Sequence, residues 1–247
     1  MSDTQVLLCD DAEAVAETAA EAFIDHITEV LEQKSEAHVV LTGGTVGIKT
    51  LAAISASTRI SEVDFNRVHF WWGDERFVAA ESADRNELQA REALLSKINV
   101  DESKLHAFPA GDAGLSLAEA CADFSREVAE HAAIDEIVPE FDVVFLGIGP
   151  DGHIASLFPG RAEPAPGVAV IAEPDSPKPP SARLSFGYEA LNSAHQVWFL
   201  VAGADKAQAV SVAFGDDPKS LPVGRVEGRD VTLWFIDEAA AAALLED

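Results

Sequence analysis

Strand-like and helix-like segments alternate along nearly the whole of this 247-residue chain. Short apolar, β-branched runs are followed repeatedly by longer segments whose apolar residues recur at helical spacing. This alternation is typical of a mainly parallel sheet with helices on both faces. No internal repeat or long linker interrupts it. We therefore predict a single α/β domain over residues 1–247, with three layers as in Rossmann-like folds.

The predicted strands cover residues 5–8, 38–41, 68–72, 105–108, 141–146, 168–171, 183–186, 197–201 and 231–236. The predicted helices cover residues 12–34, 86–98, 115–131 and 206–214, with one through Ile48 and Leu51, a short one near Leu191 and an alanine-rich one near the C-terminus. Glycine or charge follows four of the strands, at 42–47, 73–76, 147–153 and 203–206. Because the carboxyl ends of parallel strands share one edge of a sheet, these four segments can converge on one site.

A formal net charge of −26 limits the partners that this chain can have. It argues against nucleic acids and against anionic membrane surfaces, which an acidic protein repels. A phosphorylated small molecule is repelled in the same way, unless cations and backbone N–H groups gather locally around it. The chain has only 17 lysine and arginine residues, so each one near a glycine-rich turn is a candidate ligand for a phosphate.

The sequence lacks the features that indicate export, membrane insertion or metal binding. No apolar run approaches the roughly 20 residues that cross a bilayer, and the acidic N-terminal segment has no basic region of the kind that begins a signal peptide. Cys9 and Cys121 lie far apart, and neither a Cys/His metal cluster nor an HExxH or GxSxG motif is present. We expect a cytoplasmic protein whose two thiols are reduced and half-buried.

The segment 141–160 presents one imidazole at the end of a buried strand. Its Val-Val-Phe-Leu run suits a strand buried on both faces, and three glycines then let the backbone bend and approach a ligand. His153 lies just past this strand, where open α/β sheets bind ligands, and histidine moves protons readily near neutral pH. Asp151 can orient the imidazole or cap the next helix. The alternative is a polar loop histidine without a function.

Two further strand ends carry candidate ligands. Gly43, Gly44 and Thr45 precede a helix, where backbone N–H groups suit a phosphate, although the spacing is neither that of a P-loop nor GxGxxG. The alternative is a tight turn with a capping threonine. Asp74 and Arg76 follow a strand that ends in two tryptophans, which indicates deep placement, and an arginine can grip a phosphate bidentately. A solvated surface turn is the alternative there.

The remaining candidate cations lie in a proline-rich segment, 176–183, and at the start of a helix. The prolines stiffen the loop that holds Lys178 and Arg183, so less entropy is lost when the loop grips an anion. A simple connection to an edge strand is the alternative. Lys206 begins a helix, where a lysine opposes the macrodipole, and this placement indicates a bound anion.

Five stretches of the sequence together resemble the 6-phosphogluconolactonases. They are LTGGT at 41–45, WGDERFV at 72–78, GIGPDGHIASLFPG at 147–160, SPKPPSAR at 176–183 and FLVAGADKA at 199–207. The related glucosamine-6-phosphate deaminases share the fold and the glycine–aspartate–glycine–histidine core. They carry a phenylalanine–asparagine–glutamate–proline run where this chain has SLFP, and therefore an acid that this chain lacks. The first loop of the family usually includes a proline, whereas this chain reads GGTVG.

The resemblance implies hydrolysis of 6-phospho-D-glucono-1,5-lactone to 6-phosphogluconate, the second step of the oxidative pentose phosphate pathway. It implies a small-molecule sugar phosphate lactone as the substrate, with no cofactor, no metal and no obligate protein partner. The alternatives are a glucosamine-6-phosphate deaminase or sugar-phosphate isomerase, and a non-catalytic sugar-phosphate sensor on the same fold.

The resemblance also suggests roles for the candidate residues. His153 is expected to take a proton from the attacking water and then to protonate the departing ring oxygen. Asp151 or, as the favoured choice, Asp74 from across the site is expected to orient the imidazole. Arg76 would bridge the phosphate and the catalytic zone, and Lys178 would draw the substrate in. The residues expected to hold the phosphate are Gly43, Gly44, Thr45, Arg183 and Lys206.

Overall fold

The computed structural model describes residues 3–245 of the chain. Its largest feature is a seven-stranded sheet in the order β1-β10-β9-β6-β2-β3-β5, in which all neighbouring strands run parallel. The strands of this sheet are β1 (Asp3–Cys9), β2 (Ala37–Leu41), β3 (Val68–Trp72), β5 (Leu105–His106), β6 (Val143–Leu146), β9 (Gln196–Val201) and β10 (Val231–Asp237). The predicted mainly parallel α/β fold is confirmed.

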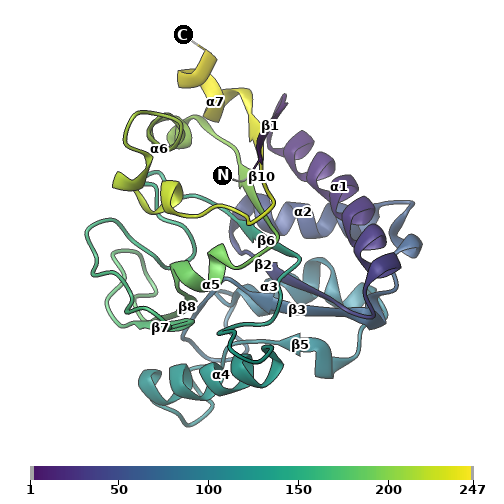
Figure 1. The fold of residues 1–247 in the computed structure, drawn as a ribbon, viewed down its shortest axis with the longest axis vertical. Coiled ribbons are helices and arrows are strands. Elements are labelled where there is room, and N and C mark those ends of the chain that lie inside the picture. The colour runs from purple at the N-terminus through teal and green to yellow at the C-terminus, as the bar shows by residue number, and fades with distance from the viewer. Residues whose placement is uncertain (1–2, 246–247) are drawn as a thin grey trace.

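Helices cover the sheet, with α1 on one side and α4, α5 and α6 towards the other (Figure 1). The helices are α1 (Ala12–Gln33), α2 (Gly44–Ala56), α3 (Asn86–Ala93), α4 (Leu117–His131), α5 (Tyr188–Asn192), α6 (Ala207–Ala213) and α7 (Glu238–Leu245). Two predicted helices are shorter than expected. The one at 86–98 ends as α3 and continues as a 3₁₀ turn, and the one at 206–214 begins with a 3₁₀ turn before α6.

The most apolar strands occupy the interior of the sheet. Every residue of β3 and β6 is buried, as expected where helices cover both faces. From α1, Phe23 packs its ring edge-on against Phe145 of β6, with 5.7 Å between the centroids. The Asp11 side chain begins α1 by accepting hydrogen bonds from the backbone N–H groups of Glu13 and Ala14, both at 2.9 Å. Local sequence signals and long-range packing therefore agree in this part of the molecule.

A second, antiparallel sheet departs from the sequence prediction. It has the order β4-β8-β7 and consists of β4 (Asp74–Arg76), β7 (Val170–Glu173) and β8 (Arg183–Phe186). Residues 73–76 were expected in a loop, and the proline-rich segment was weighed as leading to an edge strand, but β8 is the central strand of this sheet. A three-residue strand is too short to show alternating polarity, so its pairing could not be read from the sequence.

Across residues 3–245, no helix combines the length and the apolar character needed to cross a membrane. Both cysteines are free, but Cys9 is buried, and only Cys121 is half-buried as predicted. Burial raises the pKa of each thiol above its usual value, so both are protonated at neutral pH.

Candidate active site

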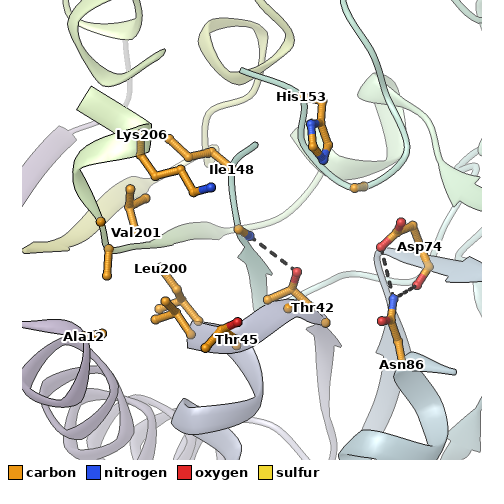
Figure 2. A pocket seen from close by; sticks show the side chains of 18 of the residues that line it. Ala12, Thr42, Thr45, Asp74, Asn86, Ile148, His153, Leu200, Val201 and Lys206 are labelled. Carbon is orange, nitrogen blue, oxygen red and sulfur yellow. Dashed lines mark hydrogen bonds between the residues drawn. The ribbon is translucent and has the colours of Figure 1, made fainter. Parts of the chain in front are cut away.

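A cavity of about 500 Å³ opens at the carboxyl edge of the large sheet (Figure 2). The segments that follow β2, β3, β6 and β9 line it together with β8, so the four strand ends converge as predicted. Two of the predicted site residues, Asp151 and Lys178, contact His153 rather than the cavity itself. The predicted residues that line the cavity are Gly43, Gly44, Thr45, Asp74, Arg76, His153, Arg183 and Lys206.

The imidazole of His153 is fixed through its Nδ1 atom. Nδ1 lies 2.6 Å from Asp151 Oδ1, and the Lys178 ammonium lies 3.2 Å from Nδ1 and 3.3 Å from the same carboxylate oxygen. An ionised carboxylate only accepts, so the Nδ1–H of His153 donates to Asp151 and Nε2 keeps its lone pair. Burial lowers the pKa of His153 below its usual value, against the opposing effect of the Asp151 hydrogen bond. The ring is therefore neutral at physiological pH.

Packing holds the same ring from two more directions. Phe158 lies against His153 with 4.8 Å between the ring centroids. Gly149 lies so close that a Cβ atom there would be 1.9 Å from Nδ1 and 2.5 Å from Asp151 Oδ1. Only glycine fits beneath this imidazole–carboxylate pair, which explains one of the glycines that the sequence places before it.

Asp74 does not orient His153, and this corrects the favoured expectation. Its Oδ2 accepts a 2.6 Å hydrogen bond from Ser156 Oγ and lies 3.7 Å from Nη1 of Arg183. Asn86 Nδ2 donates to the Asp74 backbone carbonyl at 2.9 Å and lies 3.4 Å from Oδ1 (Figure 2). The pairing of β4 with β8 turns Asp74 toward these partners, so it acts on His153 only through its charge.

Glu75, the second acid after β3, has a structural function. Its Oε1 accepts from the backbone N–H groups of Arg76 and Asn86, both at 2.8 Å, and its Oε2 accepts from that of Glu87 at 2.9 Å. It is buried, with the guanidinium of Arg85 at 3.5 Å. Glu75 thus caps the start of α3. The alternative of a solvated surface turn at 73–76 is wrong.

Two guanidinium groups enter the cavity from adjacent strands, because Arg76 of β4 is in register with Arg183 of β8. Arg76 donates from Nη1 to the carbonyl of Asp84 at 2.7 Å, but its Nε is buried without a hydrogen-bond partner within residues 3–245. Arg183 is buried and donates to the carbonyls of Pro180 and Lys178, at 3.0 and 3.1 Å. Burial lowers the pKa of Arg183, and the charge of Arg76 adds to this effect. An anion between the two groups would relieve their repulsion.

The first glycine loop ends in a helix N-terminus that faces the cavity. The helix α2 begins at Gly44, which has a φ of +81°, and Gly43 precedes it as the N-cap without a side-chain hydrogen bond. A Cβ at Gly43 would lie 2.0 Å from Asn86 Oδ1, so the loop packs tightly on α3. The helix forms although the proline usual in the family is replaced by Gly47. Its free N–H groups at Thr45 and beyond offer an anion site.

Lys206 reaches the cavity from the opposite side to His153, and Figure 2 shows Thr45 on the same side as Lys206. It closes the 3₁₀ turn before α6 and pairs with Asp205 at 2.7 Å. This ion pair stabilises the lysine at a helix start without a bound anion, so its position alone does not indicate one. The backbone here is fixed by Gly203, whose N–H lies 3.0 Å from both carboxylate oxygens of Asp237.

Further polar residues at this site were not among the predicted ones: Thr42, Asn86, Ser156, Asp205 and Asp237. Asn86 contacts Asp74 and Gly43, and Ser156 holds the Asp74 carboxylate. Asp205 lies within the FLVAGADKA stretch, and its position next to Lys206 was a usable signal. No sequence signal indicated Asn86 or Asp237 as site residues, because their partners are distant in the sequence. Within residues 3–245, the one group of histidine, cysteine and acidic residues with metal-like spacing lies outside this cavity.

Comparison with known proteins identifies the family. The sequence profile of the glucosamine-6-phosphate isomerases/6-phosphogluconolactonase family matches residues 10–234. The chain therefore belongs to this family, which combines an α/β fold with a sugar-phosphate site. A 6-phosphogluconolactonase of Streptomyces coelicolor is 41% identical over 99% of this chain and 96% of its own length. One of Mycobacterium tuberculosis is 38% identical over 95% of this chain and 96% of its own length.

Solved structures show the same fold. The 6-phosphogluconolactonase of Thermotoga maritima superposes with a TM-score of 0.81 at 28% identity, covering 95% of this chain and 100% of that one. The enzyme of Trypanosoma brucei gives a TM-score of 0.85 at 24% identity, covering 99% and 100% of the two chains. A monomeric glucosamine-6-phosphate deaminase reaches 0.77 at 21% identity, covering 97% and 99%. The fold is therefore shared by both activities, and the residues of the site must distinguish them.

Proposed function

We propose that the protein hydrolyses 6-phospho-D-glucono-1,5-lactone to 6-phosphogluconate, in the pentose phosphate pathway. Relatives at 38–41% identity over almost the whole chain carry the name of this activity. The run after His153 also favours it over the deaminase. Where the deaminases have a glutamate, this chain has Phe158, which packs on the imidazole. An acid that the deaminases carry is therefore replaced here by an apolar contact.

The observation that carries the proposal is a neutral imidazole, hydrogen-bonded to a carboxylate, at the edge of a cavity that also holds two guanidinium groups. His153 Nε2 takes a proton from water as the water oxygen attacks the lactone carbonyl, and the imidazolium then donates that proton to the departing ring oxygen. The ester C–O bond breaks, the ring oxygen becomes a hydroxyl group, and the carboxylic acid that forms releases its remaining proton to solvent as a carboxylate. Asp151 stabilises the imidazolium through its 2.6 Å hydrogen bond.

The phosphate is proposed to occupy the side of the cavity near α2. The N–H groups after Gly44 and the ammonium of Lys206 supply donors there, and Arg183 supplies a buried guanidinium. Arg76, with its unpartnered Nε, would bridge the phosphate and the lactone ring. Lys178 would attract the substrate and keep Asp151 ionised. These local cations offset the repulsion that a −26 chain exerts on a phosphate.

The activity is tested with fresh lactone generated in situ, with product formation coupled to 6-phosphogluconate dehydrogenase. An enzyme-free control is essential because the lactone also hydrolyses unaided. A rate well above that control supports the proposal, and a rate equal to it rejects the proposal. Formation of fructose 6-phosphate from glucosamine 6-phosphate is measured in parallel and would instead identify a deaminase.

We expect Gly149→Ala to lower kcat by about tenfold or more, because its Cβ would displace the imidazole from Asp151, and a 1 Å displacement can cost that much. Gly73→Ala is the matched control, since a Cβ there meets its nearest neighbours at 3.6 Å or more. Steady-state kinetics and thermal unfolding of both variants are compared. If Gly149→Ala retains full kcat, the imidazole is not held as the packing indicates.

We expect Lys206→Ala to raise KM by about tenfold with little change in kcat, because a phosphate is gripped equally in the ground and transition states. Lys49→Ala is the control, because Lys49 forms a comparable 2.7 Å ion pair with Glu13 outside the cavity. A fall confined to kcat would place Lys206 at the reacting carbonyl.

We also propose a cytoplasmic location, which the two free thiols, Cys9 and Cys121, support.

A further inference from the structure

Three histidines gather at the β3–β5 edge of the large sheet, outside the candidate active site. His69 is the second residue of β3, His106 ends β5, and His131 ends α4. One ring nitrogen from each lies within 4.8 Å of those of the other two. His69 and His106 are buried, whereas His131 is exposed and opens the group to solvent. The three residues do not line the cavity that contains His153.

The hydrogen bonds determine which nitrogens carry lone pairs. His106 Nδ1 lies 2.8 Å from Glu127 Oε1 and donates to it, because a carboxylate only accepts. His106 Nε2 therefore accepts from His69 Nδ1, 2.8 Å away, and His69 Nε2 accepts from the Lys104 ammonium at 3.1 Å. His131 Nδ1 donates to the backbone carbonyl of Glu127 at 2.9 Å, which leaves its Nε2 free to accept. In both His106 and His131, the hydrogen bond from Nδ1 to Glu127 therefore leaves the lone pair on Nε2.

We propose that His69, His106 and His131 bind a divalent transition metal ion of the zinc class. The ligand atoms would be His69 Nδ1 and the Nε2 atoms of the two other residues. Imidazole nitrogen is the preferred ligand of zinc, cobalt, nickel and copper, whereas magnesium and calcium prefer oxygen. In a tetrahedral zinc site the nitrogens are about 3.3 Å apart. This spacing lies between the 2.8 Å of the buried pair and the 4.8 Å limit of the group.

The surroundings of the three rings suit a metal. Histidine ligands usually donate their second N–H to a carboxylate or a backbone carbonyl. Glu127 provides both, through Oε1 to His106 and through its carbonyl to His131. For His69 the proton would move to Nε2, where Glu36 Oε2 lies 3.5 Å away. Lys104, which already pairs with Glu36, would then turn from the ring. A water molecule would complete the tetrahedron on the exposed side.

Metal binding at this position would stabilise the fold. It would join the end of α4 to β3 and to the two-residue edge strand β5, which is held in the sheet by β3 alone. An ion that binds only the folded state raises the unfolding temperature, and the rise grows with the logarithm of the ion concentration once that exceeds the dissociation constant. The ion would not contact the substrate, so we expect lactone hydrolysis to be the same with and without it.

The experiment uses metal-stripped full-length protein in excess Mg²⁺, which occupies carboxylate sites. Co²⁺ is added, its visible absorption is followed, and Zn²⁺ then displaces it in a calorimeter. We expect one equivalent of Co²⁺ with the strong bands of a tetrahedral nitrogen-ligated ion, and a higher unfolding temperature with Zn²⁺. No binding, more than one equivalent of equal affinity, or an octahedral spectrum would overturn the proposal.

The decisive variant is His131→Gln, because His131 is exposed and its replacement should leave the fold intact. We expect it to weaken Zn²⁺ binding at least about tenfold and to remove the rise in unfolding temperature. His195→Gln is the matched control, since His195 is a half-exposed histidine with Glu140 and Asp230 each at 2.6 Å. His153→Gln controls for the catalytic cavity. Unchanged binding in His131→Gln, or binding lost in either control, would place the metal elsewhere.

Discussion

His153→Ala is expected to lose about 10²–10⁴-fold in kcat for lactone hydrolysis while the protein remains folded, which is the usual contribution of a positioned acid–base group. The imidazole of His153 lines the cavity and, when neutral, can accept a proton from water and return it to the ring oxygen. The imidazole is neutral because burial lowers the pKa of His153. Its Nε2 keeps a free lone pair because Nδ1 donates a hydrogen bond to Asp151. The rate left in the variant would come from binding and from the guanidinium groups alone.

His195→Gln is the control for this variant, because it also removes one imidazole that is flanked by carboxylates, but far from the cavity. Its kcat should equal that of the wild type. Circular dichroism and thermal unfolding should show that both variants are folded. If His153→Ala keeps near-full activity in the coupled assay, the base is another group, and the mechanism proposed here is wrong even if the protein is a lactonase.

The parts of this molecule that follow from short-range sequence patterns were predictable. The all-apolar strands β3 and β6 are local signals, and the rule that parallel strands share their carboxyl edge brings their ends together. The convergence of Thr45, Arg76, His153 and Lys206 on one cavity follows from these two facts. Nothing about the direction of any side chain was needed for that prediction.

Side-chain direction was not predictable. Asp74 and Asp151 are both acids near the end of a buried strand, and the sequence does not show which one faces His153. The answer depends on the pairing of β4 with β8, which turns Asp74 toward Ser156 and Arg183. That pairing joins segments far apart in the chain, and three residues carry too little pattern to reveal it.

The grouping of His69, His106 and His131 could not be predicted from the sequence either. A search for metal motifs detects ligands that are close in sequence, as on one turn of helix or in one loop. These three residues come from two strands and a helix, and only the register of β5 on β3 and the position of α4 bring them together. The absence of a Cys/His motif in the sequence therefore says little about metal sites that the fold assembles.

The second large effect is expected from Asp151→Asn, which should lower kcat by about 10²–10⁴-fold. The Asn amide can donate to Nδ1, which favours the tautomer with its proton on Nε2, and that tautomer cannot accept a proton from water. Asp74→Asn is the matched comparison, because it removes a carboxylate that is also near His153 but bonded to Ser156 instead. Its effect on kcat should be clearly smaller, and an equal or larger one would restore Asp74 as the orienting group.

The pH profile of the same variants separates positioning of His153 from a general loss of structure. The base acts when neutral, so kcat/KM should be full above the pKa of His153 and fall as the pH drops through it. Burial lowers that pKa from the usual 6.5, so the wild-type acid limb lies below pH 6.5. Asp151 opposes the shift through its hydrogen bond and charge. Asp151→Asn should therefore move the acid limb to still lower pH, and Asp74→Asn should move it less. An unmoved limb in Asp151→Asn would mean that the group titrating is not His153.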